Sequence, residues 1–360
     1  MTPFQPITAP DDAELDRLCR QLADGAGQID LSGQWPADQL RWLGESGVYR
    51  WFMPRDSGGF EWTEADLVRG YMRLSAACLT TTFILTQRSA AVRRIVECDN
   101  AAAKLALLPS LADGSRFSTV GISHLTTSRR HLAKPVLEAR ETDGEFILNG
   151  YSPWVTGAAH ADHVVVGATL EDGRQILLAT PRSLSGITVP PHVSLLALTA
   201  SHTGPIEFRD VRVERQWLLD GPMENVIAGR SGTKTGGLQT SALAAGLSAA
   251  AIDFLAHESQ QRPDLVGATD RLQNEHNQLE HDLIAMASGV PTCSSDEVRA
   301  RANSLALRCT QAALAAAKGA GYASAHPAGR WCREALFFLV WSCPQPVMNA
   351  NLCELAGLGD

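Results

Sequence analysis

The sequence predicts an α+β protein with three parts: helices first, a β domain in the middle and a helical bundle at the end. Apolar residues recur at helical spacing up to about residue 112 and again after residue 223. Between them lie short runs rich in β-branched residues, separated by Asp-Gly, Asn-Gly and Ser-Gly turns. A chain of 360 residues, 45% of them hydrophobic, can bury sizeable cores. We therefore expect domains at residues 1–114, 115–221 and 222–360.

Helical spacing defines the first part. Leu15, Leu18 and Leu22 recur three or four residues apart, as on one face of a helix, and similar spacing includes Leu40. The segment 52–60, FMPRDSGGF, breaks this pattern because its proline and its pair of glycines force an irregular turn. The first part is therefore predicted to be helical, with one loop inside it.

Seven short runs predict the strands of the middle part. They cover residues 117–122, 135–141, 145–150, 163–170, 174–180, 186–189 and 205–213. Runs of this kind at short, regular spacing are typical of antiparallel sandwiches and barrels. We expect an antiparallel β domain of seven or eight strands.

Two long alanine-rich stretches predict the final bundle. Residues 240–261 and 296–320 each sustain a helical pattern over 20 or more residues. Alanine favours helices, and its small side chain lets neighbouring helices pack closely. The prediction is a bundle of long helices in close contact.

Charge and cysteine content exclude several classes of protein. The formal net charge is −8 and no cluster of five or more Lys or Arg occurs, so binding to nucleic acid or to an anionic membrane is not expected. The eight cysteines form no Cys-x-x-Cys pair and no zinc-spaced set, which predicts reduced thiols in the cytoplasm and no metal site. No signal peptide and no uninterrupted apolar stretch of 18 residues is present, so no membrane span is expected.

The most informative segment is LNGYSPWVTGAAHAD, residues 148–162. It resembles the acyl-CoA dehydrogenases, in which an Asn-Gly pair leads to a Trp-(Ile/Val)-Thr strand edge and then to an Ala-Asp pair before the next strand. Asn149, Gly150, Trp154, Thr156 and Asp162 match that pattern. The resemblance implies that Trp154 and Thr156 lie against the isoalloxazine ring of a flavin, FAD or FMN.

Segments on both sides of this motif extend the resemblance. LLPSLADG at residues 107–114 is similar to the family's approach to its first strand, and IEFRDVRVERQWLLDG at residues 206–221 is similar to the exit from its β domain. The order of helices, β domain and long-helix bundle is also that of the acyl-CoA dehydrogenase fold. The resemblance therefore implies this fold for almost the whole chain.

The loop ISHLTTS, residues 122–128, stands where the family has a loop that hydrogen-bonds the flavin and the substrate region. Ser123, Thr126 and Thr127 retain hydroxyl groups there, although the family's Glu-Pro pair is missing. The resemblance implies flavin contacts from these three residues. The alternative is an ordinary polar loop at the end of a strand.

Cofactor anchors in the final part are partly retained. Arg262 and Gln273 match residues that, in this family, reach the cofactor diphosphate and adenosine of a neighbouring subunit, a contact that suits the donor fork of a guanidinium. Gly319 belongs to the family's Gly-rich turn, and Lys318 replaces a Gly of the family near the diphosphate. The resemblance thus implies a homodimer or homotetramer. The alternative for Arg262 is a solvated contact at a helix end.

The family's catalytic base is missing. The closing block places Trp341 on the aromatic residue before the catalytic Glu, and Ser342 on the Glu itself. Some members carry this Glu on the helix after the β domain, but Gln239 and Thr240 are among the residues at the matching positions. A serine hydroxyl is too weak a base to remove the α-proton of a thioester. The candidate replacements are Glu354 and the histidines His124, His160 and His202, each with a structural or surface role as the alternative. His124, in the loop beside the expected flavin, is the one to test.

Three functions remain open. The first is a flavin-dependent oxidoreductase that acts on an acyl-CoA or a similar small-molecule substrate, with altered or lost α-proton abstraction. The second is a flavin-dependent monooxygenase of the same fold, whose relatives lack the Glu and use reduced flavin. The third is a homologue that keeps the fold and catalyses nothing. In the third case Trp154 and Thr156 are ordinary core and turn residues.

Overall fold

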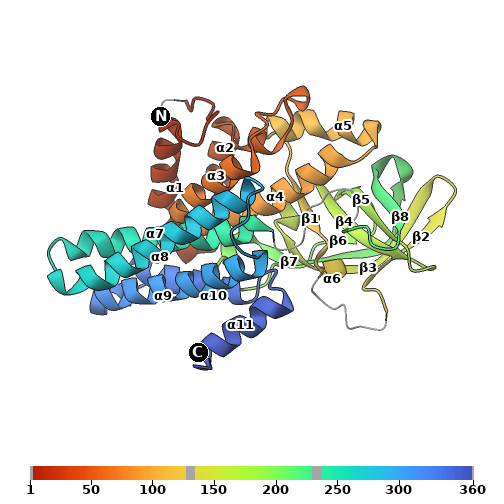
Figure 1. The fold of residues 1–360 in the computed structure, drawn as a ribbon. Helices are drawn as coiled ribbons and strands as arrows, with labels where there is room; N and C mark the ends of the chain where they lie inside the picture. The colour runs from red at the N-terminus through yellow and green to blue at the C-terminus, as the bar shows by residue number, and fades with distance from the viewer. Residues whose placement is uncertain (1–2, 127–133, 229–236, 359–360) are drawn as a thin grey trace.

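The computed structural model describes residues 3–126, 134–228 and 237–358, and it confirms the predicted order of helices, β domain and helical bundle (Figure 1). Two short 3-10 turns lie in and next to the predicted loop at residues 52–60, η1 (Val48–Phe52) and η2 (Arg55–Ser57). The helices of the first part are α1 (Ala13–Ser32), α2 (Ala37–Glu45), α3 (Glu64–Ala77), α4 (Leu79–Glu97) and α5 (Ala101–Ala112).

Polar side chains fix where three of these helices begin. The carboxylate of Asp12 accepts a hydrogen bond from the second residue of α1, and Thr63 and Asn100 cap α3 and α5 in the same way. Such caps satisfy backbone N–H groups that have no partner inside the helix. At the other end of α1, Gly33 adopts a left-handed conformation with φ of 63°, which glycine allows at little cost.

The middle part is a single sheet of eight strands, which confirms the predicted strand count. Its order is β6-β7-β3-β2-β4-β5-β8, with β1 paired to β4. Most neighbours are antiparallel as predicted, but β1 and β2 both run parallel to β4, so the sheet is mixed. The short helix α6 (Ser123–Thr126) lies in the long connection from β1 to β2, and a connection of this length allows both to run in one direction. The strands are β1 (Ser118–Gly121), β2 (Leu137–Thr142), β3 (Glu145–Thr156), β4 (His163–Leu170), β5 (Gln175–Pro181), β6 (Ile187–Thr188), β7 (Thr203–Glu214) and β8 (Leu218–Met223).

Strand β3 is longer than predicted and carries the flavin motif. It continues from Glu145 to Thr156 beside β7, with irregular register on both sides of residues 150–152. Gly150 has φ of 123°, and a Cβ atom there would lie 2.1 Å from the carbonyl oxygen of Val136. Only glycine fits this bulge, which redirects the second half of the strand.

The final part contains the long helices predicted from its alanine content. Figure 1 shows α7, α8 and α9 side by side and extending away from the sheet. Among the described helices, α7 alone is long and apolar enough to cross a membrane, but 67% of that stretch is buried inside the protein, as in a core helix. The elements are α7 (Leu238–Ser259), η6 (Pro263–Leu265), α8 (Val266–Ala287), α9 (Ser295–Gly321), α10 (Pro327–Leu336), η7 (Phe337–Leu339) and α11 (Gln345–Leu355).

The first and last helical parts share one hydrophobic core. Their closest approach is between α3 and α7, where the hydroxyl of Ser75 donates to the carbonyl of Leu243 at 2.7 Å. A Cβ atom on Gly246 would lie 2.3 Å from the carbonyl oxygen of Met72, so the two helix backbones are almost in contact. Separate cores fill the interior of the β domain and the space between the sheet and α4 and α5.

Replacing Gly246 by alanine tests this close approach. The added methyl group must push α3 and α7 apart, so we expect Gly246→Ala to lower the free energy of unfolding by about 1–3 kcal/mol in urea denaturation. Gly27→Ala in α1 is the matched control, because a Cβ atom there meets nothing within 4 Å. The control should be stabilising by about 0.5–1 kcal/mol. Equal effects at both positions would contradict the packing argument.

Candidate functional site

A cavity of about 1100 Å³ lies between α3, α4, the β domain, the start of α7 and the segment from α10 to residue 342. It brings together five of the residues predicted from the sequence: Ser123, Thr126, Trp154, Thr156 and Ser342. Gln239 and Thr240, the alternative positions for the family's base, also line it. Residues that are far apart in the chain thus meet at one site.

The β domain contributes a wall to this cavity. The side chain of Trp154 is 47% exposed, whereas its neighbour Val155 is completely buried in the core of the sheet. The hydroxyl of Thr156 lies 2.9 Å from that of Thr203, which itself lies 2.8 Å from the hydroxyl of Ser201. Because side chains alternate along a strand, Trp154 faces the cavity while Val155 faces the core. The contact between Thr156 and Thr203 helps to hold β3 beside β7.

Two hydroxyl groups in the cavity lining lack partners. The Oγ atom of Ser123 and the Oγ1 atom of Thr240 are buried and make no hydrogen bond in the described part of the chain. Buried polar groups normally have a partner, so these two are available to a ligand. Ser123 is the first residue of α6, and Thr240 lies in the first turn of α7.

Ser342 lies at one end of the cavity, next to a group of aromatic side chains, which we call the aromatic end. Its φ of 46° is in the left-handed region, directly after Trp341. The indole of Trp341 stacks on Phe337 with centroids 5.0 Å apart, and Phe83 of α4 contacts it edge-on at 5.0 Å. The carbonyl of Trp341 accepts a hydrogen bond from the buried Arg299 at 2.9 Å. These contacts fix the backbone that presents Ser342.

One stripe of α4 forms the floor of the cavity, which the sequence did not reveal. Phe83, Gln87, Ala90, Arg94 and Glu97 are spaced three or four residues apart and all line the cavity. From the first to the last of them is 14 residues, or about 21 Å of helix at 1.5 Å per residue. The cavity is therefore long, with an aromatic end and a charged end.

Four charged side chains line the end of the cavity away from Trp341. Arg93 pairs with Glu64 at 2.9 Å. Arg94 is 8% exposed, its Nη1 atom donates to the Ala90 carbonyl at 3.0 Å, and its Nε atom has no partner among the described residues. Burial lowers the pKa of Arg94 to about 10, and burial raises the pKa of Glu97. Both glutamates of the described lining are at this end, so they do not replace a base at Ser342.

His124 is not part of the described cavity lining. The residue is 6% exposed, and its Nε2 atom lies 2.7 Å from the carbonyl oxygen of Gly167, while Nδ1 has no described partner. Burial lowers the pKa of this imidazole and favours its neutral form. In the single turn α6, Ser123 and Thr126 share a face directed at the cavity and His124 points elsewhere. Thr127 lies outside the described residues.

The four predicted anchors in the bundle are away from the cavity lining. The Nη1 atom of Arg262 donates to the carbonyl of Ala316 at 2.6 Å, which places it close to the kink of α9 at Lys318, where φ is 53°. Lys318 and Gly319 are exposed there. The side-chain amide of Gln273 donates to Asn277 at 2.8 Å on α8. Arg262, Lys318 and Gly319 thus form a separate group at one end of the bundle.

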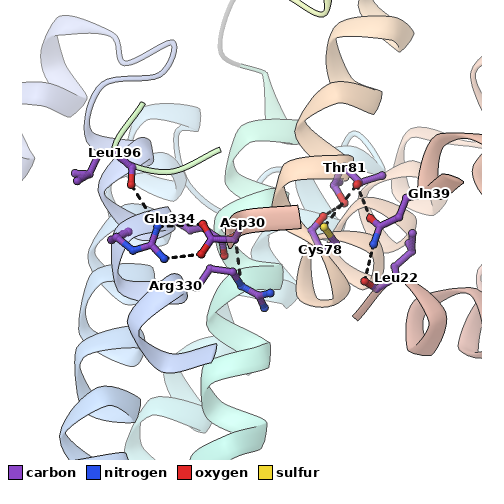
Figure 2. Close-up of polar contacts among 10 residues, drawn as sticks. Leu22, Asp30, Gln39, Cys78, Thr81, Leu196, Arg330 and Glu334 are labelled. Atoms are coloured by element: carbon purple, nitrogen blue, oxygen red, sulfur yellow. Dashed lines mark hydrogen bonds and ion pairs between the residues drawn. The ribbon is translucent and has the colours of Figure 1, made fainter. Parts of the chain in front are cut away.

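A network of buried and partly buried polar side chains supports the cavity wall. Figure 2 shows Asp30, at the end of α1, beside α10. Arg333, which lines the cavity, donates to both carboxylate oxygens of Asp30 at 2.6 and 3.0 Å and to the carbonyl of Leu196 at 3.4 Å. On the same helix Glu334 is 3% exposed and lies 3.6 Å from Arg330. This network ties α1, α10 and the loop around Leu196 together.

A second set of contacts in Figure 2 joins the first helices. The side-chain amide of Gln39 donates to the carbonyl of Leu22 at 2.8 Å, and its oxygen accepts from the hydroxyl of Thr81, which also lies 3.5 Å from Cys78. Every polar atom of the Gln39 side chain therefore has a partner, as burial requires. These contacts hold α4 in place against α1 and α2.

The chain has relatives of known activity. Residues 15–115 match the family described as acyl-CoA dehydrogenase, N-terminal domain. The chain is 23% identical to the mitochondrial short-chain specific acyl-CoA dehydrogenase of Mus musculus over 360 residues, which cover 93% of this chain and 87% of that protein. A glutaryl-CoA dehydrogenase from Mycobacterium smegmatis, solved in complex with FADH2, matches with a TM-score of 0.82 at 17% identity over 96% of this chain and 95% of that one. A dibenzothiophene monooxygenase from a Paenibacillus species matches with a TM-score of 0.79 at 15% identity over 96% of both chains.

The pH dependence of stability tests the burial of Glu334. Burial raises the pKa of this carboxyl from an ordinary value of 4.5 to about 7, against the opposing effect of Arg330. The folded protein therefore holds the proton more tightly than the unfolded chain, and this carboxyl makes stability fall as pH rises from 4.5 to about 7. We expect the stability of Glu334→Gln relative to the original protein to rise across this range, by at most roughly 3 kcal/mol.

Denaturant unfolding at several pH values measures this difference. Glu207→Gln, on the exposed side of β7, provides the reference for losing one carboxylate at the surface. A stability difference for Glu334→Gln with the same pH trend as Glu207→Gln would contradict the assignment.

Proposed function

The chain belongs to the acyl-CoA dehydrogenase superfamily, and on that premise we propose that it is a flavin-dependent oxidoreductase working in the cavity of about 1100 Å³. Its substrate is an acyl-CoA or a similar small molecule. It does not use the family's α-proton abstraction from the position of Ser342. The observation that carries this proposal is the serine that lines the cavity there.

The residues of the cavity fit a flavin, FAD or FMN. Trp154 offers a large aromatic face to the cavity, where its side chain is 47% exposed. Ser123 and Thr240 offer buried hydroxyls without partners, which suit the polar atoms of a flavin ring or of a substrate. A bound flavin supplies the redox chemistry, which no side chain in the lining can perform.

The substitution at Ser342 determines which chemistry the site supports. Abstraction of an α-proton needs a base with a pKa near the working pH, placed within hydrogen-bond reach of that proton. Ser342, Gln239 and Thr240 carry no such group, and the charged end of the α4 stripe begins about 17 Å of helix from Phe83, which contacts Trp341. We therefore propose a redox enzyme that does not couple hydride transfer to removal of an α-proton.

The charged end of the cavity favours a substrate with a polar part. Arg94 keeps an unpaired Nε donor there, while Arg93 is occupied by Glu64. An acceptor group on the substrate would satisfy Arg94, because a buried guanidinium is costly without one. The aromatic end around Phe83, Phe337 and Trp341 suits an apolar part of the same substrate.

A monooxygenase that uses reduced flavin is the second candidate. The fold of this chain is shared with a dibenzothiophene monooxygenase, and the loss of the base at both positions removes the requirement that is specific to dehydrogenation. Reduced flavin would then be delivered by a separate reductase.

We also propose that the protein forms a homodimer or homotetramer. Arg262, Lys318 and Gly319 lie together but away from the cavity of their own chain. Their place is explained if they contact the cofactor of a neighbouring copy, as the resemblance implies. Gln273, farther along α8, would serve the same cofactor.

Flavin binding is the first test, with Trp154 as its probe. The purified protein should be yellow after reconstitution with FAD, and Trp154→Ala should raise the dissociation constant about tenfold, because stacking on a large aromatic face contributes roughly 1–1.5 kcal/mol. Leu105→Ala on α5, which removes an 80% exposed apolar side chain elsewhere, should bind FAD normally. A protein that binds neither FAD nor FMN at any concentration tested would be the non-catalytic homologue.

Activity assays separate the two enzymatic candidates. Reduction of bound flavin by a panel of acyl-CoAs without oxygen would support oxidation of a thioester. Oxygen consumption and substrate hydroxylation with NADH and a flavin reductase would support the monooxygenase.

Installing the missing carboxylate tests the role of Ser342. We expect Ser342→Glu to accelerate anaerobic flavin reduction by butyryl-CoA by roughly 100-fold or more, since a positioned general base contributes about 10²–10⁴ in rate. Ser342→Gln is the control, because glutamine has the size of glutamate and meets the same backbone φ of 46° but cannot take a proton. This variant should show no gain in the rate of flavin reduction. Rapid reduction in the original protein would show that another base is present, and the proposal of a lost proton step would be wrong.

A further inference from the structure

A second cleft, of about 310 Å³, lies beside α4. It shares no lining residue with the cavity of about 1100 Å³, which we call the flavin cavity. Arg88 of α4 lines this cleft, whereas its neighbour Gln87 lines the larger cavity. The other walls come from α2, from η1, from the segment between α5 and β1, and from His160. One helix therefore borders two separate cavities.

Arg88 is a buried cation with unused donors. The residue is 1% exposed, and its Nη2 atom donates to the carbonyl of Leu111. Its Nε and Nη1 atoms are buried without a hydrogen-bond partner, and no carboxylate in the described part of the chain is within ion-pair distance of them. The ring of Tyr49 covers one face of the guanidinium at 3.6 Å, and the Tyr49 hydroxyl is fixed by the carbonyl of Leu40 at 2.7 Å. Buried charges in proteins are normally paired, so Arg88 is suited to an anionic partner.

The cleft is what distinguishes Arg88 from a second buried arginine. Arg299 on α9 is 2% exposed, donates from Nη2 to the carbonyl of Trp341, and also leaves Nε and Nη1 without described partners. It lines neither cavity. Unused donors alone therefore do not mark a binding site, but unused donors at the wall of a cleft offer a place for a ligand.

The charges around the cleft favour an anion. Arg41 at the rim is already paired with Glu45 at 2.7 Å. This leaves Arg88 and the exposed Arg116 facing a single carboxylate, Asp113, which accepts a hydrogen bond from the backbone of Ser115 at 2.8 Å. Apart from the Arg41–Glu45 pair, the charged residues of the lining are Arg88, Arg116 and Asp113, so their net charge is positive.

The walls of the cleft are flat and aromatic. Trp35 stacks on His160 with ring centroids 4.2 Å apart and planes at 11°, and Phe117 meets Trp35 edge-on at 5.6 Å. Gly44 and Gly114 make room for the ring of Tyr49, because a Cβ atom on either would lie 3.1 Å from it. A flat, apolar ligand body fits such walls, and the volume suits a ligand of about ten heavy atoms.

We propose that this cleft binds a small aromatic carboxylate. Its carboxylate accepts hydrogen bonds from Arg88 and Arg116, and its ring lies against Trp35 and Phe117. Charge-assisted bonds from a guanidinium to a carboxylate are among the stronger ones in proteins, and the low dielectric around Arg88 strengthens them further. This site is additional to the flavin cavity and does not depend on the function proposed for that cavity.

Calorimetric titration of the full-length protein with benzoate at constant ionic strength tests the proposal. One molecule of benzoate should bind per chain, and the uncharged benzamide should bind at least roughly tenfold more weakly. Arg88→Gln should weaken benzoate binding by about tenfold or more. Arg299→Gln, the matched buried arginine, should leave it unchanged.

Two surface variants keep the test decisive if Arg88→Gln does not fold. Asp113→Asn removes the competing negative charge and should tighten benzoate binding by about threefold, whereas Arg116→Gln should weaken it by a similar factor. Binding should be the same with and without FAD. No binding of benzoate, equal binding of benzamide, competition by FAD, or equal effects of Arg88→Gln and Arg299→Gln would each overturn the proposal.

Discussion

The arrangement of both cavities depends on α4, a helix most of whose residues are buried between other elements. Polar residues at such a site need partners, and most of them find one within their own helix: Thr82 donates to Cys78, Thr86 to Phe83 and Ser89 to Thr86. The arginines cannot be satisfied in this way because each carries five N–H donors. Arg88 and Arg94 each leave donors unused, and each lines a cavity.

The position of α4 is fixed by contacts at both of its ends. Thr81 near its start is held by Gln39 of α2, and Arg93 near its end pairs with Glu64 at the start of α3. The bundle is held against the same region by the packing of Gly246 on α3 and by the pair of Arg333 with Asp30. The cavity wall therefore consists of elements that are joined by buried and partly exposed polar contacts and by close backbone contact, which gives a preformed site.

The sequence predicted the β side of the site better than its helical side. Trp154 and Thr156 sit in a strand, where alternation determines the face of each residue, and they do line the cavity. On α4 the pattern is weaker, because buried residues occur on most of its faces and apolar spacing does not separate the face of Arg88 from that of Arg94. In the single turn α6, Ser123 and Thr126 face the cavity and His124 does not. The sequence does not specify which residues of so short a helix face the cavity.

The cavity shows why a lost catalytic residue does not by itself mean a lost function. Ser342 offers no base at the aromatic end, yet Trp154 is exposed in the same cavity and two hydroxyls of its lining have no described partner. Buried polar atoms without partners destabilise a folded protein unless a ligand satisfies them. At the other end Arg94 adds a buried charge that a purely apolar substrate could not satisfy. These features are what we expect if the proposed flavin and substrate bind in this cavity.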